Sequence, residues 1–414
     1  MLELFNYYVQ SLETYIMFKI GEEIVRIKPE LEAKGRAPIA LTIGAPVAPP
    51  PKFVIDKLKQ ALDTDAFHTY STPKGEVFFL EAAAKYMQRR FGVEVDAKKE
   101  VFSLIGSKEG IANMIRALIN PTPKESERDI IMIPDPAYAS YKEMIKTSGG
   151  LAYSVPLTFE NNYMPDMDEI WENMPKEGYD VKKVKALMIN YPNNPLGATA
   201  TFDYYKKVVA FCKKHNILLM SDNAYADMYF DEKYKPHSIL EVEGAKEIAV
   251  EFYSFSKPFA MTGWRLGWVC GNSEAIGIFG KLKSTIDTGL FKALQKAASE
   301  VLNSKEGDEY IQQANIGFKK KQEIAVKGFS EMGWDLTNRV PDATFYLWLP
   351  IPSRYKTSKE FTDDLMYKSG VIAVPGDAFG RFGEGFFRIS IVCSEENLYN
   401  VFERMKQDGF YFNK

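Results

Sequence analysis

The residue whose chemistry stands out first is Lys257, which follows the apolar run VEFYSFS. Burying an ammonium group is costly unless the group is paired or modified. A lysine that forms a Schiff base with a carbonyl compound avoids this cost, and desolvation keeps it reactive. Ser254, Ser256 and Arg265 lie close to Lys257 in the chain and predict an anion site beside it. Taken alone, a lysine after a strand is more often an ordinary surface residue.

Short apolar runs lie upstream of this lysine and alternate with helical or polar stretches. Uninterrupted apolar strands with helices between them indicate a parallel sheet that is covered on both faces. In open α/β sheets, ligands bind at the carboxyl ends of the strands. Polar residues stand at that end of several runs here, so we expect the site there. The runs are 130–134, 186–190, 217–222 and 250–256.

The rest of the chain predicts a large α/β domain and a smaller α+β domain. The first 41 residues have the pattern of an arm and a helix, and 293–331 has helical composition with few breakers. Three further apolar runs, at 345–350, 371–375 and 386–392, predict strands of the smaller unit. The predicted division is an N-terminal arm that contributes to the small domain (1–45), a large cofactor-binding domain (46–292) and a small C-terminal domain (293–414).

The composition excludes several classes of protein. The 414 residues are 46% hydrophobic, and 52 basic residues balance 55 acidic ones, so a general nucleic-acid binder is not expected. No stretch approaches the roughly 18 apolar residues of a membrane span. The N-terminus lacks the basic start of a secretory signal, which predicts a cytoplasmic protein. Scattered cysteines and histidines argue against disulfides and a metal centre; they are Cys212, Cys270, Cys393, His68, His215 and His237.

Four motifs together make the chain resemble one enzyme family. They are S-F-S-K-x-x-x-M-T-G-W-R-L-G, N-Y-P-N-N-P-L-G, D-N-A-Y and G-E-G-F-F-R-I-S, and the similarity extends in order from Gly44 to Arg388. The chain resembles the class I/II aminotransferases, fold-type-I enzymes that use pyridoxal 5′-phosphate. The resemblance implies that an amino group moves between an amino acid and a 2-oxo acid. It also implies that Lys257 binds the cofactor covalently and then shuttles protons.

The resemblance assigns further residues to the cofactor ring. Asp222 pairs with the protonated ring nitrogen and keeps the ring an electron sink, although an aspartate there also suits a helix N-cap. Tyr225 and Asn194 donate to the phenolate oxygen, whereas a core tyrosine and a plain turn are their ordinary interpretations. The family pattern favours Asn194 over Asn193. Tyr138 stacks on the ring by family position, and its apolar face orients the ring.

The phosphate of the cofactor has its own predicted residues. Gly106-Ser107-Lys108-Glu109-Gly110 lies between a strand-like and a helix-like stretch, and N–H groups at a helix start bind phosphate. The segment is not the GxxxxGK[ST] loop of nucleotide-binding proteins. Its residues Ser107 and Lys108 are therefore assigned to the cofactor, together with Ser254, Ser256 and Arg265. By resemblance Tyr70 reaches the phosphate of a neighbouring subunit, which implies a homodimer with shared active sites.

Two residues are assigned to the core of the substrate. Arg388 offers a planar guanidinium that binds an α-carboxylate through two hydrogen bonds, while an outward-facing arginine is the ordinary interpretation within a strand. Gly44 corresponds to a backbone contact with the substrate. The chain departs from the family pattern at Val47, where aspartate is frequent, and at Pro258.

Lys108 is the clue to the amino donor. In LL-diaminopimelate and some aspartate aminotransferases a matching lysine contacts the distal part of the substrate. The predicted donors are therefore LL-diaminopimelate or aspartate, with 2-oxoglutarate as acceptor, although glutamate and alanine remain compatible. Pro73 stands where the diaminopimelate enzymes place a glutamate, and Asp287 or Lys292 of the partner are candidates to replace it. A lyase or synthase on the same fold, and a non-catalytic binding protein, are the alternatives.

Overall fold

A computed structural model describes residues 4–14 and 16–413 of the chain. Its centre is a seven-stranded sheet in the order β2-β8-β7-β6-β5-β3-β4, in which only β8 runs against its neighbours. The mostly parallel sheet confirms the predicted α/β fold class. The strands are β2 (Val101–Leu104), β3 (Ile130–Asp135), β4 (Leu151–Pro156), β5 (Val184–Asn190), β6 (Leu218–Asp222), β7 (Ala249–Ser254) and β8 (Gly267–Gly271).

Helices cover both faces of this sheet, as the apolar strands require. Two separate clusters of buried side chains lie between the strands and these helices. The strands predicted at 130–134, 186–190, 217–222 and 250–256 correspond to β3, β5, β6 and β7. One face packs against α3 (Lys52–Leu62), α4 (Val77–Phe91), α8 (Phe202–His215) and α10 (Lys292–Leu302); the other packs against α5 (Ser107–Leu118), α6 (Ser140–Thr147) and α9 (Ser273–Lys283).

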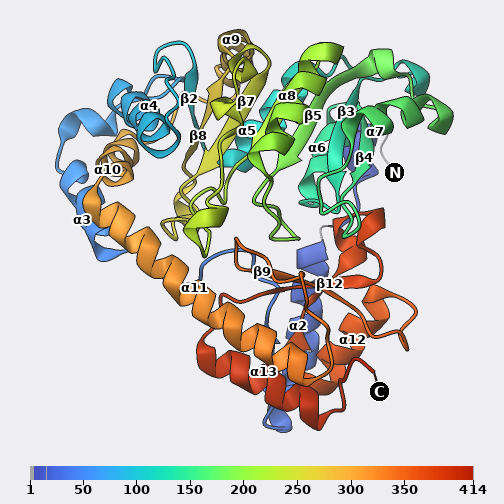
Figure 1. Cartoon of the computed structure of the whole chain (residues 1–414). Coiled ribbons are helices and arrows are strands. Elements are labelled where there is room, and N and C mark those ends of the chain that lie inside the picture. The colour runs from blue at the N-terminus through green and yellow to red at the C-terminus, as the bar shows by residue number, and fades with distance from the viewer. Residues whose placement is uncertain (1–3, 15, 414) are drawn as a thin grey trace.

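A smaller α+β unit lies below the large sheet in Figure 1. Its antiparallel sheet has the order β11-β12-β9, and a short parallel pair joins β1 to β10. The N-terminal part of the chain thus contributes a strand and a helix to this region. The elements are α2 (Ile16–Ala33), β1 (Ile39–Ala40), β9 (Tyr346–Pro350), α12 (Ser358–Ser369), β10 (Val371–Ile372), β11 (Val374–Pro375), β12 (Phe386–Ser390) and α13 (Glu395–Gln407).

The helical stretch predicted at 293–331 is two helices, α10 and α11 (Lys305–Glu331). Ser304 separates them, because its hydroxyl accepts a hydrogen bond from the Gly307 N–H and caps α11. Helix α10 packs against α3 and α4, whereas α11 runs diagonally down to the smaller unit (Figure 1). We therefore propose the second domain division between α10 and α11. The predicted boundaries at 45 and 292 stay predictions.

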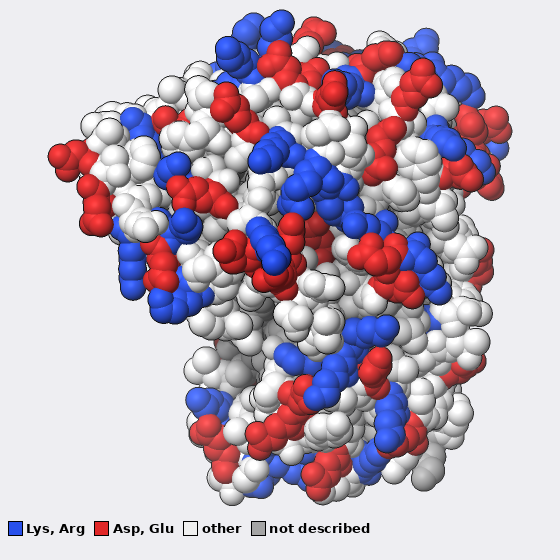
Figure 2. All heavy atoms as spheres, turned by 60° about the vertical axis from the view of Figure 1, so that its left-hand side comes forward, with Lys and Arg blue, Asp and Glu red and all other residues white. Residues whose placement is uncertain are grey.

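The charged side chains do not gather by sign. Figure 2 shows lysine and arginine interspersed with aspartate and glutamate over one face of the molecule. Within residues 4–14 and 16–413 no helix is both long enough and apolar enough to cross a membrane. No group of three His, Cys, Asp or Glu side chains in that part of the chain is placed to hold a metal ion.

Candidate active site

The carboxyl ends of β5, β6 and β7 meet at a cavity of about 300 Å³ between the two sheets. This is the edge at which open parallel sheets bind ligands. Every residue predicted to bind the cofactor or the core of the substrate lines this cavity except Tyr70. The lining includes Gly44, Ser107, Lys108, Tyr138, Asn194, Asp222, Tyr225, Ser254, Ser256, Lys257, Arg265 and Arg388.

Lys257 lies three residues beyond the end of β7, and its amine donates to the carbonyl oxygen of Gly44. The amine also lies 5.6 Å from the centre of the Tyr225 ring. Burial lowers the pKa of Lys257 to about 8, the positive charge of Arg388 acts in the same direction, and Asp222 opposes it. About a tenth of the amine is therefore neutral at pH 7, far more than for an ordinary lysine, and the neutral form is the one that acts as a nucleophile or a proton acceptor.

Asp222 is the last residue of β6, and a turn follows it, so it is not a helix N-cap. Its carboxylate accepts hydrogen bonds from the Tyr141 hydroxyl at 2.5 Å and from the Ala224 N–H at 3.3 Å. Burial raises the pKa of Asp222, although the hydrogen bond from Tyr141 and the charge of Lys257 work against this rise. A positively charged group in the cavity would pair with this carboxylate and lower its pKa again.

Arg388, on β12, is a buried cation with only 3% of its surface exposed. It donates to the side-chain oxygen of Asn194 and to the carbonyl oxygen of Thr42, both at 2.8 Å. Its Nε is buried without a hydrogen-bond partner, and no salt bridge within the described residues neutralises its charge. A buried guanidinium in this state is prepared to bind an anion such as a carboxylate.

Hydrogen bonds at the carboxyl ends of β5 and β6 fix the asparagine residues beside Asp222. Asn190, the last residue of β5, donates to the Asp222 carbonyl oxygen at 2.8 Å and accepts from the Asn194 N–H at 2.9 Å. Asn194 lines the cavity, and its oxygen is engaged by Arg388, so its NH₂ group is the part that suits an acceptor on a ligand. Asn193 instead caps its own loop by accepting from the Leu196 N–H.

An anion-binding corner lies at the start of α5. Gly106 has a φ of +84°, and a Cβ on it would lie only 2.3 Å from a guanidinium nitrogen of Arg265, so glycine permits this approach. Arg265 also contacts the Ser256 hydroxyl at 3.4 Å. Ser107 begins the helix, where N–H groups point outward with the positive end of the helix dipole. These groups together suit a phosphate.

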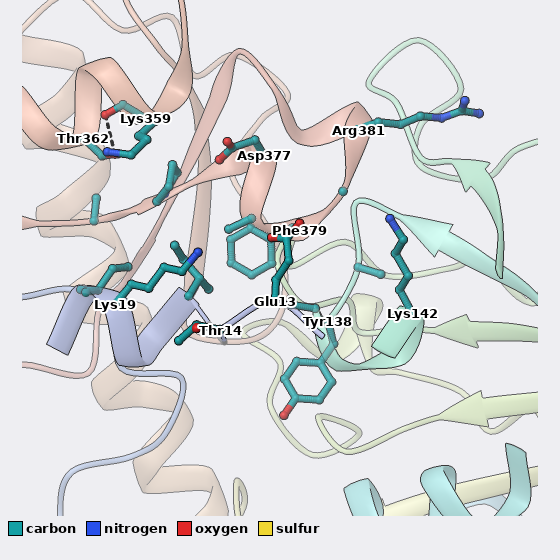
Figure 3. A pocket seen from close by; sticks show the side chains of 18 of the residues that line it. Glu13, Thr14, Lys19, Tyr138, Lys142, Lys359, Thr362, Asp377, Phe379 and Arg381 are labelled. Carbon is teal, nitrogen blue, oxygen red and sulfur yellow. Dashed lines mark hydrogen bonds between the residues drawn. The ribbon is translucent and has the colours of Figure 1, made fainter. Parts of the chain in front are cut away.

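Tyr138 and Phe379 line both this inner cavity and a larger one of about 750 Å³, which we call the outer cavity. Figure 3 shows the lining of the outer cavity. The N-terminal segment, α6, α12 and the loop after β11 line the outer cavity, with charges of both signs. Lys108 lies at the inner side, with its amine 5.6 Å from the centre of the Tyr138 ring. Lys108 is thus a basic side chain in the lining of the inner cavity.

Three predicted residues lie elsewhere. Tyr70 is 86% exposed and does not line the cavity of its own chain. Asp287 forms an ion pair with Lys283 at 2.6 Å, and the amine of Lys292 donates to the Thr69 hydroxyl at 2.8 Å. Asp287 and Lys292 are therefore engaged within their own chain, which weakens the expectation that either reaches a substrate in a partner's site.

Two tyrosines of the site escaped the sequence analysis. Tyr141 binds Asp222, and Tyr346 forms a hydrogen bond of 2.9 Å with the Tyr225 hydroxyl. The spacing of Tyr138 and Tyr141 is a usable signal, since residues three apart near a helix start share a face. Tyr346 is distant in sequence and lies in an apolar strand, so only the tertiary structure reveals it.

The side chains present fit pyridoxal phosphate. The cavity combines an amine of lowered pKa, a buried carboxylate, the Tyr225 hydroxyl and a phosphate corner, in a space of about 300 Å³. The orphaned Nε of Arg388 supplies a separate position for a carboxylate. This donor set matches the aldehyde, ring nitrogen, phenolate and phosphate of the cofactor one by one.

Comparisons with known proteins agree with this geometry. The sequence profile described as aminotransferase class I and II matches residues 36–405. The LL-diaminopimelate aminotransferase of Nitratidesulfovibrio vulgaris is 39% identical over 92% of this chain and 94% of its own. Among solved structures, substrate-bound BacF from Bacillus subtilis has a TM-score of 0.90 and 33% identity, with both chains fully covered. A single mutant of Thermus thermophilus aspartate aminotransferase has a TM-score of 0.87 and 25% identity, covering 98% of this chain and 100% of that one.

Proposed function

This chain belongs to the class I and II aminotransferase family, and from that premise we propose the role of each site residue and the preferred substrate. The chain is a pyridoxal-phosphate-dependent aminotransferase that moves an amino group between an amino acid and a 2-oxo acid. The lyase, the synthase and the non-catalytic protein are therefore set aside. The observation that carries the proposed roles is the amine of Lys257, with its lowered pKa, in one cavity with Asp222 and the unneutralised Arg388.

When bound, pyridoxal phosphate supplies an aldehyde that captures amines and a ring that accepts an electron pair. Lys257 would hold the cofactor through its amine, and the same amine in its free form would accept the proton of the substrate α-carbon. Its lowered pKa suits both tasks, because the neutral amine is the nucleophile and the base. Desolvation of the amine is therefore part of the chemistry.

Asp222 holds the ring nitrogen in its protonated state. Tyr141 donates to one carboxylate oxygen, and this bond fixes the orientation of the carboxylate toward the cavity. Tyr225 and Asn194 place O–H and N–H donors at the phenolate oxygen, and Tyr138 orients the ring by contact with its face. Ser107, Ser254, Ser256 and Arg265 hold the phosphate at the start of α5.

Arg388 binds the α-carboxylate of the substrate. The hydrogen bonds to Asn194 and Thr42 hold its guanidinium plane, and the Tyr346 ring lies 4.4 Å from its central carbon. The carbonyl of Gly44, which accepts from Lys257, belongs to the residue two positions after Thr42 in the chain. The substrate α-carbon is thereby held near the amine that moves its proton.

LL-diaminopimelate is the first candidate for the amino donor, and aspartate is the second, with 2-oxoglutarate as acceptor. The first rests on the name of relatives such as those of Nitratidesulfovibrio vulgaris and Trichormus variabilis, the latter 40% identical over 94% of this chain. The second is favoured by Pro73, which carries no charge to bind a distal ammonium, and by Lys108, which suits a distal carboxylate.

The functional unit is a homodimer with no resident metal ion. The exposed position of Tyr70 supports a role in the site of a partner subunit, because a tyrosine 86% exposed in the single chain has surface to bury. Ile286 and Phe291, 45% and 46% exposed, belong to the segment that packs against the residues around Tyr70. A dimer interface on this side would cover all three.

A single-turnover experiment without an acceptor tests the function and the donor together. The holoenzyme is mixed with one amino acid at a time, and the released 2-oxo acid and ammonia are measured. A transaminase releases about one oxo acid per subunit and no ammonia, then stops until 2-oxoglutarate is added. Continuous release of ammonia would contradict the proposal. The initial rate for LL-diaminopimelate relative to aspartate, glutamate and alanine identifies the donor.

A further inference from the structure

Lys283, the last residue of α9, is fully buried although it carries a charge. Its amine lies 3.1 Å from a carboxylate oxygen of Glu109 and 2.6 Å from one of Asp287. A buried ammonium is tolerated where such partners surround it. None of the three residues lines the catalytic cavity, so the catalytic roles proposed above leave this ion triad unexplained.

One arm of the triad reaches the phosphate corner. Glu109 lies in the first turn of α5, two residues after Ser107, and its second oxygen accepts from the Ile105 N–H at 3.0 Å. Glu109 therefore ties together the residues on both sides of Gly106. Because Lys283 holds Glu109, it fixes the loop whose N–H groups are proposed above to bind the phosphate in its own chain.

The other arm reaches the segment that presents Tyr70. Asp287 accepts from the Gly289 N–H at 2.9 Å, and a Cβ on Gly289 would lie 2.2 Å from the Thr72 carbonyl oxygen, so the two backbones touch. Gln295, which is fully buried, donates to the Ser71 hydroxyl and accepts from the Glu76 N–H. The chain between Asp287 and Gln295 thus packs against the segment that contains Tyr70 and holds it in place.

We propose that Lys283 is a positioning residue that sets two half-sites at once: the phosphate loop of its own active site and the Tyr70 segment offered to the partner's site. The second half rests on the shared-site dimer proposed above. Removal of the ammonium leaves two carboxylates on either side of an empty position. Their repulsion moves the phosphate loop and the Asp287 loop apart, so both half-sites of one chain are disturbed together.

Cofactor affinity tests the first half of this proposal. Apoprotein of Lys283→Met is titrated with pyridoxal phosphate, and the exposed Lys281→Met on the same helix serves as the control. The affinity of Lys283→Met falls about tenfold, as expected for the loss of an ionic anchor, and that of Lys281→Met is unchanged. A folded Lys283→Met dimer with wild-type affinity overturns the proposal.

A second variant keeps this test decisive if Lys283→Met does not fold. The triple variant with Lys283→Met, Glu109→Gln and Asp287→Asn contains no unpaired buried charge, so its fold is expected to survive. It has lost the ionic anchor all the same, and its affinity for pyridoxal phosphate falls as in the single variant. Wild-type affinity in the triple variant shows that the triad serves folding alone and overturns the proposal.

Hybrid dimers test the second half. One subunit carries Lys257→Ala, so only the site of the other subunit turns over. Lys283→Met is then added to the inactive subunit, where it acts only through the Tyr70 segment. We expect kcat/KM of the remaining site to fall severalfold, in the direction of the loss caused by Tyr70→Ala on that same subunit. If Tyr70→Ala lowers kcat/KM of the remaining site and Lys283→Met does not, the proposed coupling is wrong but the shared site stands. If neither variant changes kcat/KM, the proposed shared site is wrong, and the coupling that depends on it is wrong too.

Discussion

Two buried carboxylates on neighbouring strands of the large sheet have different surroundings. Burial raises the pKa of both Asp222, at the end of β6, and Glu251, in β7. Glu251 is saturated by donors of its own chain, whereas Asp222 accepts, among the described residues, only from Tyr141 and the Ala224 N–H. The donors to Glu251 are the hydroxyls of Ser221, Ser238 and Tyr253, the amide of Asn223 and the N–H of Ile239.

The difference separates a structural group from a group available to a ligand. A buried carboxyl group is stabilised by several hydrogen bonds, and Glu251 obtains them within the fold. The Asp222 carboxylate lines the cavity with hydrogen-bond acceptor positions still open, so a cationic group of a bound ligand can occupy them. Ser221 and Asn223, which flank Asp222 in sequence, are both bound by Glu251. The saturated carboxylate therefore stabilises the strand end that carries the open one.

The largest effect is expected for Asp222→Ala. It removes the partner of the ring nitrogen, so turnover falls by on the order of a hundredfold or more, and pyridoxal phosphate binds more weakly. Steady-state kinetics at saturating cofactor measure the first effect, and titration of the apoprotein measures the second. Near-normal turnover would show that the open carboxylate is as structural as Glu251.

The same contrast applies to cations. Arg388→Lys keeps the charge but loses the bidentate geometry, so kcat/KM falls about ten- to hundredfold for every amino donor. Lys108→Ala lowers kcat/KM for donors with a distal carboxylate and spares alanine. Arg90→Lys is the control for Arg388→Lys, since Arg90 is partly buried but already paired with Asp227 at 3.1 Å. Equal losses for aspartate and alanine in Lys108→Ala would end the case for a distal carboxylate.

A smaller effect is expected for Tyr141→Phe. This variant removes only the hydroxyl that donates to Asp222, so kcat falls by about tenfold, while KM for the amino donor stays nearly constant. The absorption spectrum of the bound cofactor should also change its pH dependence, because the carboxylate beside the ring nitrogen has lost a donor. An unchanged kcat together with an unchanged spectrum would contradict a positioning role for Tyr141.

The smallest effect on turnover is expected for Glu251→Gln. The amide cannot accept all five donors, so the free energy of unfolding falls by about 1–3 kcal/mol in urea denaturation. The kcat of the folded enzyme stays within about twofold of wild type, because Glu251 does not line the cavity. A large loss of kcat without a loss of stability would contradict the assignment of Glu251 as a structural group.

The sheet and most of the cavity could be predicted from the sequence because the signals are local. Apolar runs that end in polar residues identify β5, β6 and β7, and the motif around Lys257 identifies the chemistry. The break between α10 and α11 could also be found, since Ser304 is a typical N-cap before a helix.

The contacts across the chain could not be predicted in this way. Tyr346 meets Tyr225 over 121 positions of sequence, and Lys283 meets Glu109 over 174. No periodicity connects such pairs, because they depend on how the two sheets and their helices pack. Asp287 had the chemistry of a substrate ligand in sequence, but it pairs with Lys283 four residues earlier, a spacing that the sequence could have suggested.

The account depends most directly on Lys257 being the residue that captures the cofactor. Apoprotein is mixed with pyridoxal phosphate at several pH values, reduced with borohydride, digested and examined by mass spectrometry. We predict the label on Lys257 alone. The initial capture rate should rise with pH, by about tenfold per unit below pH 8, and level off above it, because only the neutral amine reacts and its pKa is about 8. A label on another lysine, or a rate that keeps rising to pH 10 as for an exposed amine, would contradict the account.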